Sequence, residues 1–216
     1  MHIIVFAAGS LRSGSGVQEA LASADLVIAA DKGAQTALDY GLTPCVIIGD
    51  FDSLTLPEPE LRARGCELVR VAEEKDETDT ELALQLALEH GATRITLLGG
   101  WGGERMEHAL GNIMLLASIT SVPVRLVDGP SVCWVVHGPA RTQVHGTSND
   151  LLSLFPLVGD VTGLTTTNLQ YALRDGCLRF GSPRGISNVL THDLAEVEVG
   201  SGVLLLVHTR RSELQE

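Results

Sequence analysis

Two carboxylates stand two residues apart in the segment GDFDSL at residues 49–54, directly after the apolar residues 45–48. Like charges this close repel each other unless a cation or hydrogen bonds compensate them. No cluster of His or Cys lies nearby in the sequence, so the ion that suits Asp50 and Asp52 is Mg²⁺, which proteins bind through one or two carboxylates together with phosphate groups. The pair alone fits a metal–phosphate site and a solvated turn capped by Ser53 equally well.

Two further aspartates could join this pair. Asp31 follows the apolar run 26–30, at the carboxyl end of an expected strand, where open α/β sheets bind their ligands. Asp79 lies in EKDETDTELAL at residues 74–84. There a capping box begins at Thr78, and Asp79 would also complement the helix dipole. Taken alone, Asp79 therefore fits a structural role better than a ligand role.

A glycine-rich stretch, LLGGWGGERMEHALGNI at residues 97–113, joins an expected strand to an expected helix. Glycines allow the backbone to approach a ligand closely, and a helix N-terminus offers free N–H groups to an anion. Arg105 could add a forked donor to phosphate oxygens. The stretch is neither a Walker A loop nor a dinucleotide fingerprint, so a flexible connector stays an alternative.

The elements that would position these residues alternate between strand and helix over the first 122 residues, which indicates a parallel sheet covered on both faces. Short β-branched or aliphatic runs predict strands, and amphipathic stretches closed by glycine or polar residues predict helices. The expected strands are Ile3–Ala7, Leu26–Ala30, Val46–Ile48, Glu67–Val71 and Arg94–Leu98, and the expected helices are Gly16–Ser23, Gly33–Tyr40, Asp79–His90 and Glu107–Ser118.

The chain after Pro123 has a different pattern, with short apolar runs separated by turn signals at intervals of about ten residues. No convincing helix appears in it, and a β-sandwich is the simplest architecture. We therefore expect an α/β fold of two domains: an N-terminal parallel-sheet domain at residues 1–122 that carries the chemistry, and a C-terminal β-sandwich domain at residues 123–216.

Composition limits the function. A chain of 216 residues with 44% hydrophobic and 19% charged residues is typical of a soluble globular protein, and we expect a cytoplasmic location. The formal net charge of −12 argues against nucleic acid as a partner, because phosphate backbones require basic surface. The apolar N-terminal run is too short for a membrane span, and we expect no membrane partner. A cationic small molecule suits the acidic field better.

Six segments together resemble the thiamin pyrophosphokinase (thiamin diphosphokinase) family, over nearly the whole chain. They are ADKGAQ (30–35), IIGDFDSL (47–54), EKDETDTELAL (74–84), RMEHALGNI (105–113), NLQYAL (168–173) and GISN (185–188). The resemblance implies an α/β domain followed by a β-sandwich, in a homodimer whose active sites are shared between subunits. It also implies transfer of a diphosphate group from ATP to the hydroxyl of thiamin, which gives AMP and thiamin diphosphate and requires Mg²⁺.

The resemblance also assigns residues to roles. The catalytic residues would be Asp31, Asp50, Asp52, Asp79 and Arg105, of which Asp50, Asp52 and Asp79 would bind the metal. Thiamin would be bound by Tyr171, Ser187 and Asn188. Apart from the resemblance, the glycine-rich loop and the neighbouring basic side chains lead us to expect that Lys75, Gly102, Gly103 and His108 bind the nucleotide.

This chain departs from the family pattern at several positions, most clearly where Glu104 and Glu107 replace a glycine and an aspartate. Glu104 would place a negative charge beside the presumed phosphate loop. Two alternatives therefore stay open: a diphosphokinase for another hydroxymethyl heterocycle, such as a pterin, and a catalytically silent regulator that binds nucleotide or thiamin. Retention of all four aspartates argues against the silent regulator, and NLQYAL and GISN argue against the pterin-like substrate.

Overall fold

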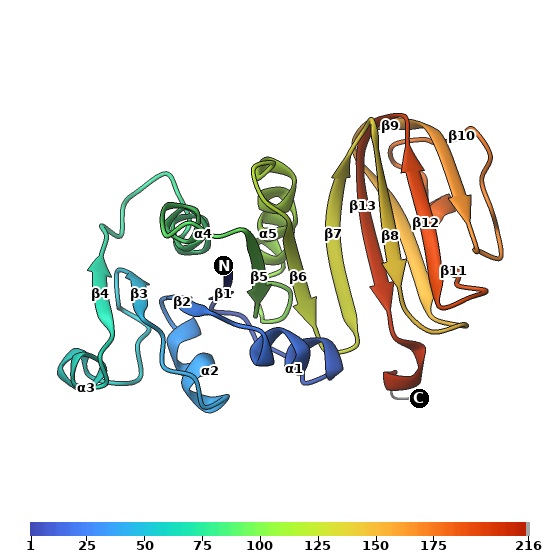
Figure 1. Cartoon of the computed structure of the whole chain (residues 1–216). Helices are drawn as coiled ribbons and strands as arrows, with labels where there is room; N and C mark the ends of the chain where they lie inside the picture. The colour runs from blue at the N-terminus through green and yellow to red at the C-terminus, as the bar shows by residue number, and fades with distance from the viewer. Residues whose placement is uncertain (215–216) are drawn as a thin grey trace. The chain divides into compact units, whose positions relative to one another are not determined.

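The computed structural model describes residues 1–214 and divides the chain into two compact units, Met1–Gly129 and Pro130–Glu216 (Figure 1). The expected boundary between residues 122 and 123 was too early. The segment Val124–Asp128 forms strand β6, which pairs in parallel with strand β5 (Arg94–Leu98) and so belongs to the first unit. The sequence of a short apolar run is the same whether the strand joins a parallel sheet or a β-sandwich. Only the strand with which it pairs distinguishes the two cases.

The first unit contains one sheet whose neighbouring strands are all parallel, in the order β4-β3-β2-β1-β5-β6. Its remaining strands are β1 (His2–Phe6), β2 (Leu26–Ala30), β3 (Val46–Gly49) and β4 (Glu67–Arg70). Every residue of β1 is buried, as expected for a central strand covered on both faces. Since all six strands run parallel to their neighbours, the loops that follow them lie at the same edge of the sheet.

Five helices connect these strands: α1 (Ser15–Ala22), α2 (Gly33–Asp39), α3 (Glu58–Ala63), α4 (Asp79–Glu89) and α5 (Met106–Ser118). Four of them lie where the sequence predicts them, within one or two residues. Helix α3 was not predicted, because six residues are too few to display a helical period. Its start and stop signals are nevertheless present: a proline and two glutamates in the first turn and Arg62 in the last turn.

The second unit is a β-sandwich, as predicted. Its strands are β7 (Ser131–His137), β8 (Ala140–His145), β9 (Leu151–Thr167), β10 (Gly176–Leu178), β11 (Asn188–Val189), β12 (Leu194–Val199) and β13 (Ser201–Thr209). The first part of β9 pairs with β13, which pairs with β7, whereas the last residues of β9 pair with β12, which pairs with β8. Strand β9 is therefore shared by both sheets. Gly159 and Gly163, both at positive φ, lie where it changes partner.

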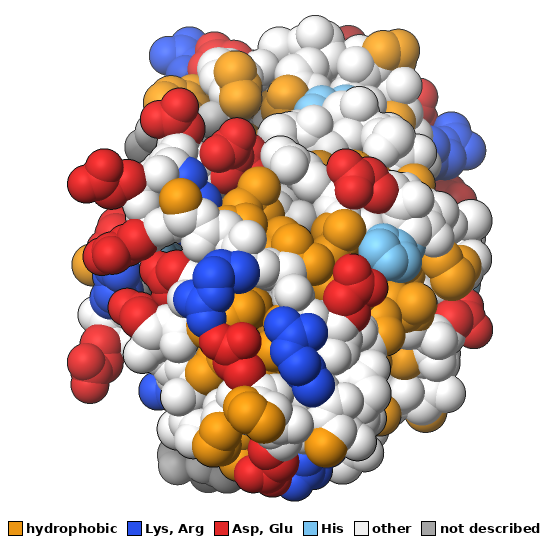
Figure 2. All heavy atoms as spheres, turned by 90° about the vertical axis from the view of Figure 1, so that its left-hand side faces the viewer, with side chains coloured by type: hydrophobic (Ala, Val, Ile, Leu, Met, Phe, Trp, Pro, Cys, Tyr) orange, Lys and Arg blue, Asp and Glu red, His pale blue; other side chains and the backbone are white. Residues whose placement is uncertain are grey.

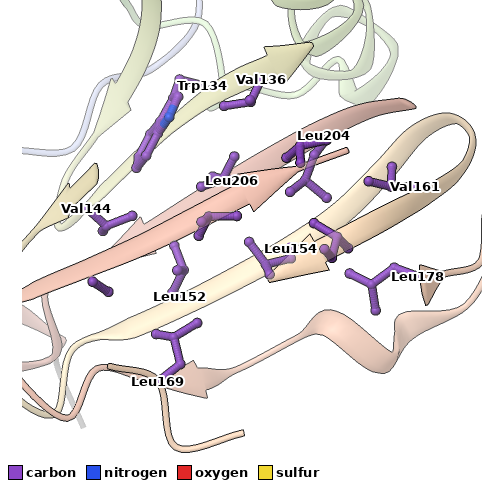
Figure 3. Close-up of a cluster of buried hydrophobic side chains, with 14 of the residues drawn as sticks. Trp134, Val136, Val144, Leu152, Leu154, Val161, Leu169, Leu178, Leu204 and Leu206 are labelled. Atoms are coloured by element: carbon purple, nitrogen blue, oxygen red, sulfur yellow. The ribbon is translucent and has the colours of Figure 1, made fainter. Parts of the chain in front are cut away.

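The core of the sandwich fills the space between these strands with aliphatic side chains and one tryptophan (Figure 3). In β13, Leu204, Leu205 and Leu206 are all buried, whereas in β9 the completely buried Leu152 and Leu164 alternate with more exposed neighbours. This alternation has the period of two that a strand with one buried face requires. The apolar runs of the sequence thus account for the strands of the second unit, whose described residues contain no α-helix and two short 3-10 helices, η1 (Pro183–Gly185) and η2 (Arg211–Glu213).

A buried aspartate–histidine pair lies in this unit. The Asp150 carboxylate accepts hydrogen bonds from the backbone N–H groups of Thr147 and Arg211 and lies 3.0 Å from Nε2 of His208. Asp150 and His208 are only 4% and 3% exposed. Burial alone would raise the pKa of Asp150, but the hydrogen bonds from the two N–H groups and from His208 outweigh it and hold the pKa below its ordinary value.

We predict that Asp150→Asn destabilises the second unit by about 2 kcal/mol near neutral pH, because charged hydrogen bonds to buried partners are lost. A carboxylate with a depressed pKa stabilises the fold above its unfolded pKa of about 3.9 and ceases to do so as the pH falls through its folded pKa. The stability gap between wild type and variant, measured by urea unfolding, should therefore narrow in acid. Glu198→Gln, which removes an exposed carboxylate paired with Arg141, is the control and should leave stability nearly unchanged. A gap that stays constant with pH would refute this role of Asp150.

Candidate active site

Three of the predicted aspartates meet at the carboxyl edge of the parallel sheet. Asp31 follows β2, and Asp50 and Asp52 follow the neighbouring strand β3. One carboxylate oxygen from each lies within 4.8 Å of the other two. The sheet therefore collects three negative charges in the volume that one cation and its ligands would occupy.

The backbone around these residues is adapted to the close approach. Asp31 has a positive φ of 46°, a conformation that aspartate tolerates better than most residues, and its N–H donates to the carbonyl of Ile48 at 2.9 Å. Ser53 donates its hydroxyl to Oδ2 of Asp31. A Cβ on Gly49 would lie only 3.0 Å from the Cβ of Asp31. The glycine of GDFDSL therefore makes room for the aspartate of the adjacent strand.

Asp31 is the most buried member of the group, at 8% exposure. Its pKa is raised, first by burial and then by the charges of Asp50, Asp79 and Asp52, against the opposing hydrogen bond from Ser53. Its Oδ1 atom is buried and has no hydrogen-bond partner among the described residues. A buried oxygen without a partner beside two further carboxylates fits a hard divalent cation such as Mg²⁺.

Asp79 lies near this group but outside the set of oxygens within 4.8 Å. The helix is capped by Thr78, whose hydroxyl accepts the N–H of Glu81 at 3.2 Å, as the capping-box interpretation requires. Oδ1 of Asp79 lies 3.2 Å from Nζ of Lys75, which also donates to the carbonyl of Ala72. The cap therefore does not need the Asp79 carboxylate, and the Asp79–Lys75 pair stands beside the acidic group.

The glycine-rich loop after β5 packs against the loop after β1. The N–H of Gly9 donates to the carbonyl of Gly99 at 3.0 Å, and a Cβ on Gly9 would lie 2.1 Å from the carbonyl oxygen of Gly102. A Cβ on Gly102 would in turn lie 2.5 Å from Oγ of Ser10. No side chain fits at Gly9 and Gly102, because the two loops touch there. This contact holds the glycine-rich loop in place, which argues against a flexible connector.

Asn112 supports the glycine-rich loop, a contact that the sequence did not predict. It lies on the buried face of α5 and donates its side-chain amide to the carbonyl of Gly100 at 2.7 Å. The helix thereby holds the glycine-rich loop that precedes it. The sequence offered one indication, a polar residue on the face of α5 that also carries Ile113 and Leu116. A buried amide needs a specific hydrogen-bond partner, so such a residue indicates a contact of this kind.

Arg105 is the residue immediately before α5, and it is paired. Its Nε donates to Oε1 of Glu107 at 2.7 Å, and Nε2 of His108 lies 4.0 Å from the same oxygen. The hydrogen bond from Arg105 is the first cause of a lowered pKa at Glu107. All three side chains are well exposed. Glu107, one of the departures from the family pattern, therefore orients the Arg105 guanidinium.

The residues expected to bind thiamin lie in the second unit, around a pocket of about 380 Å³. Its lining mixes polar and apolar groups: Leu154, Tyr171, Ala172, Leu173, Leu178, Arg184, Gly185, Ile186 and Asn188. The Asn188 amide accepts the N–H of Tyr171 at 3.0 Å and donates to its carbonyl at 2.8 Å, which leaves the ring of Tyr171 67% exposed. Asn188 thus holds Tyr171 at the pocket. Ser187 has a positive φ of 58°, and its N–H donates to Oγ of Ser153.

An acidic group at the carboxyl edge of a parallel sheet, beside a glycine-rich loop and a helix N-terminus, defines a class of enzymes that position phosphate groups around a divalent cation. Residues 17–127 match the family model of the thiamin pyrophosphokinase catalytic domain, and residues 141–204 match its vitamin B1 binding domain. The chain belongs to the thiamin pyrophosphokinase family, whose members are ATP-dependent diphosphotransferases.

Individual relatives agree with this assignment. The thiamine pyrophosphokinase of Bacillus subtilis is 34% identical over 188 residues, which cover 85% of this chain and 87% of that protein. The crystal structure of the Bacillus subtilis protein superimposes with a TM-score of 0.83 at 29% identity, over 98% of this chain and all of the other. That of the Geobacillus thermodenitrificans protein gives 0.83 at 28% identity, over 99% and 100% of the two chains. No helix within residues 1–214 is long and apolar enough to span a membrane.

We predict that metal affinity depends on pH through Asp31. Because the pKa of Asp31 is raised, its carboxylate stays protonated up to a higher pH than an ordinary aspartate does, and the proton competes with a cation. The affinity for Mn²⁺ should therefore rise as the pH increases from about 4 towards 7. Titration calorimetry with Mn²⁺ on the protein alone measures this. Asp31→Asn should bind weakly at every pH, whereas Glu89→Gln, at an exposed position on α4, should behave as wild type. Affinity that does not change with pH in wild type would exclude Asp31 from the metal site.

Proposed function

We propose that the chain transfers a diphosphate group from ATP to the primary hydroxyl of thiamin, giving thiamin diphosphate and AMP. The observation that carries the proposal is the group of Asp31, Asp50 and Asp52, with its buried and unpartnered oxygen, in a chain whose two units match the catalytic and vitamin B1 binding domains of one family. The match of the second unit to a vitamin B1 binding domain favours thiamin over a pterin-like substrate.

The chemistry needs little beyond positioning and charge compensation. The thiamin hydroxyl attacks the β-phosphorus of ATP and AMP leaves, through the loose transition state typical of such transfers. Mg²⁺ held by Asp50 and Asp52, with Asp79 as a further ligand, would neutralise phosphate charge. Asp31 would hold a metal-bound water or the hydroxyl in the same group.

The remaining negative charge of the phosphates would be met by groups on the neighbouring loops. The backbone N–H groups of Gly102 and Gly103 precede α5, and the guanidinium of Arg105, oriented by Glu107, stands beside them. Lys75 would supply a second cation from its place next to Asp79, and His108 would lie at the nucleotide. These contacts would stabilise the negative charge that develops on the phosphates in the transition state, and no covalent bond to the protein would form.

Thiamin would bind in the pocket of the second unit. The exposed ring of Tyr171 offers stacking and cation–π attraction to a cation with two aromatic rings. Arg184 also lines the pocket, so the neutral aminopyrimidine suits it better than the thiazolium cation does. Ser187, at the rim of this region, would hydrogen-bond the aminopyrimidine edge, and Asn188 would act through its hold on Tyr171.

The decisive test of the reaction is incubation with ATP, Mg²⁺ and thiamin, followed by separation of the products. The proposal expects AMP and thiamin diphosphate in equal amounts. ADP with thiamin monophosphate would contradict the assigned reaction. Binding of thiamin and ATP without any product would favour the silent regulator, and turnover of a hydroxymethyl pterin in place of thiamin would favour the other diphosphokinase.

We predict that Asp50→Asn, Asp52→Asn and Asp79→Asn each lower turnover by orders of magnitude while the fold survives, because charge stabilisation by a metal is worth several kcal/mol. Thr78→Ala is the matched control for Asp79, since it removes the cap bond to Glu81. It should cost about 1 kcal/mol of stability and leave turnover close to normal. Steady-state kinetics and thermal unfolding measure both effects. A fully active Asp79→Asn enzyme would show that Asp79 only supports the helix.

We further propose a cytoplasmic homodimer with two shared active sites, in which the first unit of one chain supplies the phosphate site and the second unit of its partner supplies the thiamin site. No nucleic acid or membrane takes part. The resemblance to the family supports the dimer. The placement of the acidic group and the Tyr171 pocket in different units is compatible with such sharing.

We predict that mixing the inactive variants Asp50→Asn and Tyr171→Ala restores activity. In a mixed dimer one shared site carries both defects and the other carries neither. Random exchange places about half of all dimers in the mixed form, so activity should return to roughly one quarter of wild type. A mixture of Asp50→Asn with Asp52→Asn, which damages the same half of the site, should stay inactive. If exchange is verified by mass spectrometry and the first mixture also stays inactive, each chain builds its own site.

A further inference from the structure

The turn that presents Asp50 and Asp52 is strained at the residue between them. Phe51 has φ 68°, a left-handed conformation that a bulky residue seldom adopts. Within the turn, the N–H of Asp52 donates to Oδ1 of Asp50 at 3.0 Å. A cation that binds Asp50 competes for this same carboxylate. The turn therefore needs a support that does not use the carboxylates, because strained backbone persists only where its surroundings hold it.

Arg70 supplies such a support from the adjacent strand. It is the last residue of β4 and lies opposite Gly49 of β3 in the parallel register. Its Nη1 donates to the backbone carbonyl of Asp50 at 2.6 Å, and its guanidinium carbon lies 4.8 Å from the centre of the Phe51 ring. The Arg70 side chain thus contacts both the backbone carbonyl of Asp50 and the ring of Phe51, the strained residue of the turn.

The guanidinium is itself anchored by a third contact. Its Nη2 donates to the carboxylate of Glu58, the first residue of α3. On the β4 and α3 side of the molecule, basic and acidic side chains lie next to one another at the surface (Figure 2). Among them, Arg64 forms an ordinary pair with Glu60 at 2.9 Å on α3.

We infer that Arg70 is a positioning residue for the metal–phosphate site, which clamps the Asp50–Phe51–Asp52 turn through the Asp50 carbonyl and the Phe51 ring. The inference rests on the proposed function, because it assigns Arg70 a role towards the cation that Asp50 and Asp52 would hold. The planar fork of arginine is required: one nitrogen reaches the carbonyl, a second reaches Glu58, and the flat face covers the ring. Lysine offers neither the fork nor the face.

Simple electrostatics and the clamp predict opposite results when the charge is removed. A positive charge beside an acidic metal site repels the cation, so its loss would strengthen metal binding if charge were its only contribution. Loss of a support that orients metal ligands weakens binding, typically by 10- to 100-fold. The sign of the change in metal affinity therefore separates a positioning role from a general charge effect.

The experiment measures Mn²⁺ affinity by calorimetry, without substrates, for wild type, Arg70→Gln, Arg70→Lys and the matched control Arg64→Gln. Arg70→Gln should weaken binding by about 10- to 100-fold, and Arg70→Lys should recover little of it. Arg64→Gln, which breaks a similar ion pair without contact to the turn, should bind as wild type. In steady-state assays Arg70→Gln should lower kcat/KM for ATP and leave the KM for thiamin unchanged.

Glu58→Gln keeps the charge and the ring contact of Arg70 but removes its anchor, and it should give a smaller loss in the same direction. This second variant decides the matter if Arg70→Gln fails to fold. The role of Arg70 would be overturned if Arg70→Gln bound Mn²⁺ as tightly as wild type or more tightly. If Arg70→Gln is unfolded, the same result for Glu58→Gln would overturn it. Failure of wild type to bind Mn²⁺ would instead count against the proposed metal site as a whole.

Discussion

Mutual repulsion of carboxylates at one edge of a parallel sheet is the constraint on which the rest of this structure depends. Asp31, Asp50 and Asp52 approach within 4.8 Å, and the most buried of them has an oxygen without a partner in the described chain. Such an arrangement is unfavourable for the isolated protein. A cation and the phosphates that accompany it would make the arrangement favourable, so the cost of assembling the site would be recovered on binding.

The neighbouring structure keeps this unfavourable group in place. The parallel register sets β2 beside β3, Gly49 allows Asp31 to approach, and Ser53 and Arg70 fix the turn from two sides. The glycine-rich loop is fixed in a similar way, by backbone contact with the loop after β1 and by Asn112 of α5. The proposed phosphate site would therefore be pre-organised by the fold, which is what a reaction dominated by positioning requires.

The sequence predicted the elements whose signals are local. The aspartates after β2 and β3 could be placed together because carboxyl ends of neighbouring parallel strands meet at one edge, and the sandwich followed from its alternating apolar runs. Features set by pairing could not be predicted. Strand β6 was assigned to the wrong unit because residues 99–123, which include helix α5, separate it in the sequence from its partner β5. Arg70 was missed because the role inferred for it depends on lying opposite Gly49. Asn188 was named from the family resemblance, but the hold of its amide on the backbone of Tyr171 could not be predicted.

The central claim is that the aspartates at the sheet edge hold a divalent cation against the phosphates of ATP. Anomalous diffraction from crystals grown with Mn²⁺ and a non-hydrolysable ATP analogue tests it most directly. The account predicts a manganese peak within about 2.0 to 2.4 Å of carboxylate oxygens of Asp50 and Asp52, and in contact with the analogue's phosphates. A manganese ion bound to the phosphates alone, or at another place on the chain, would contradict it.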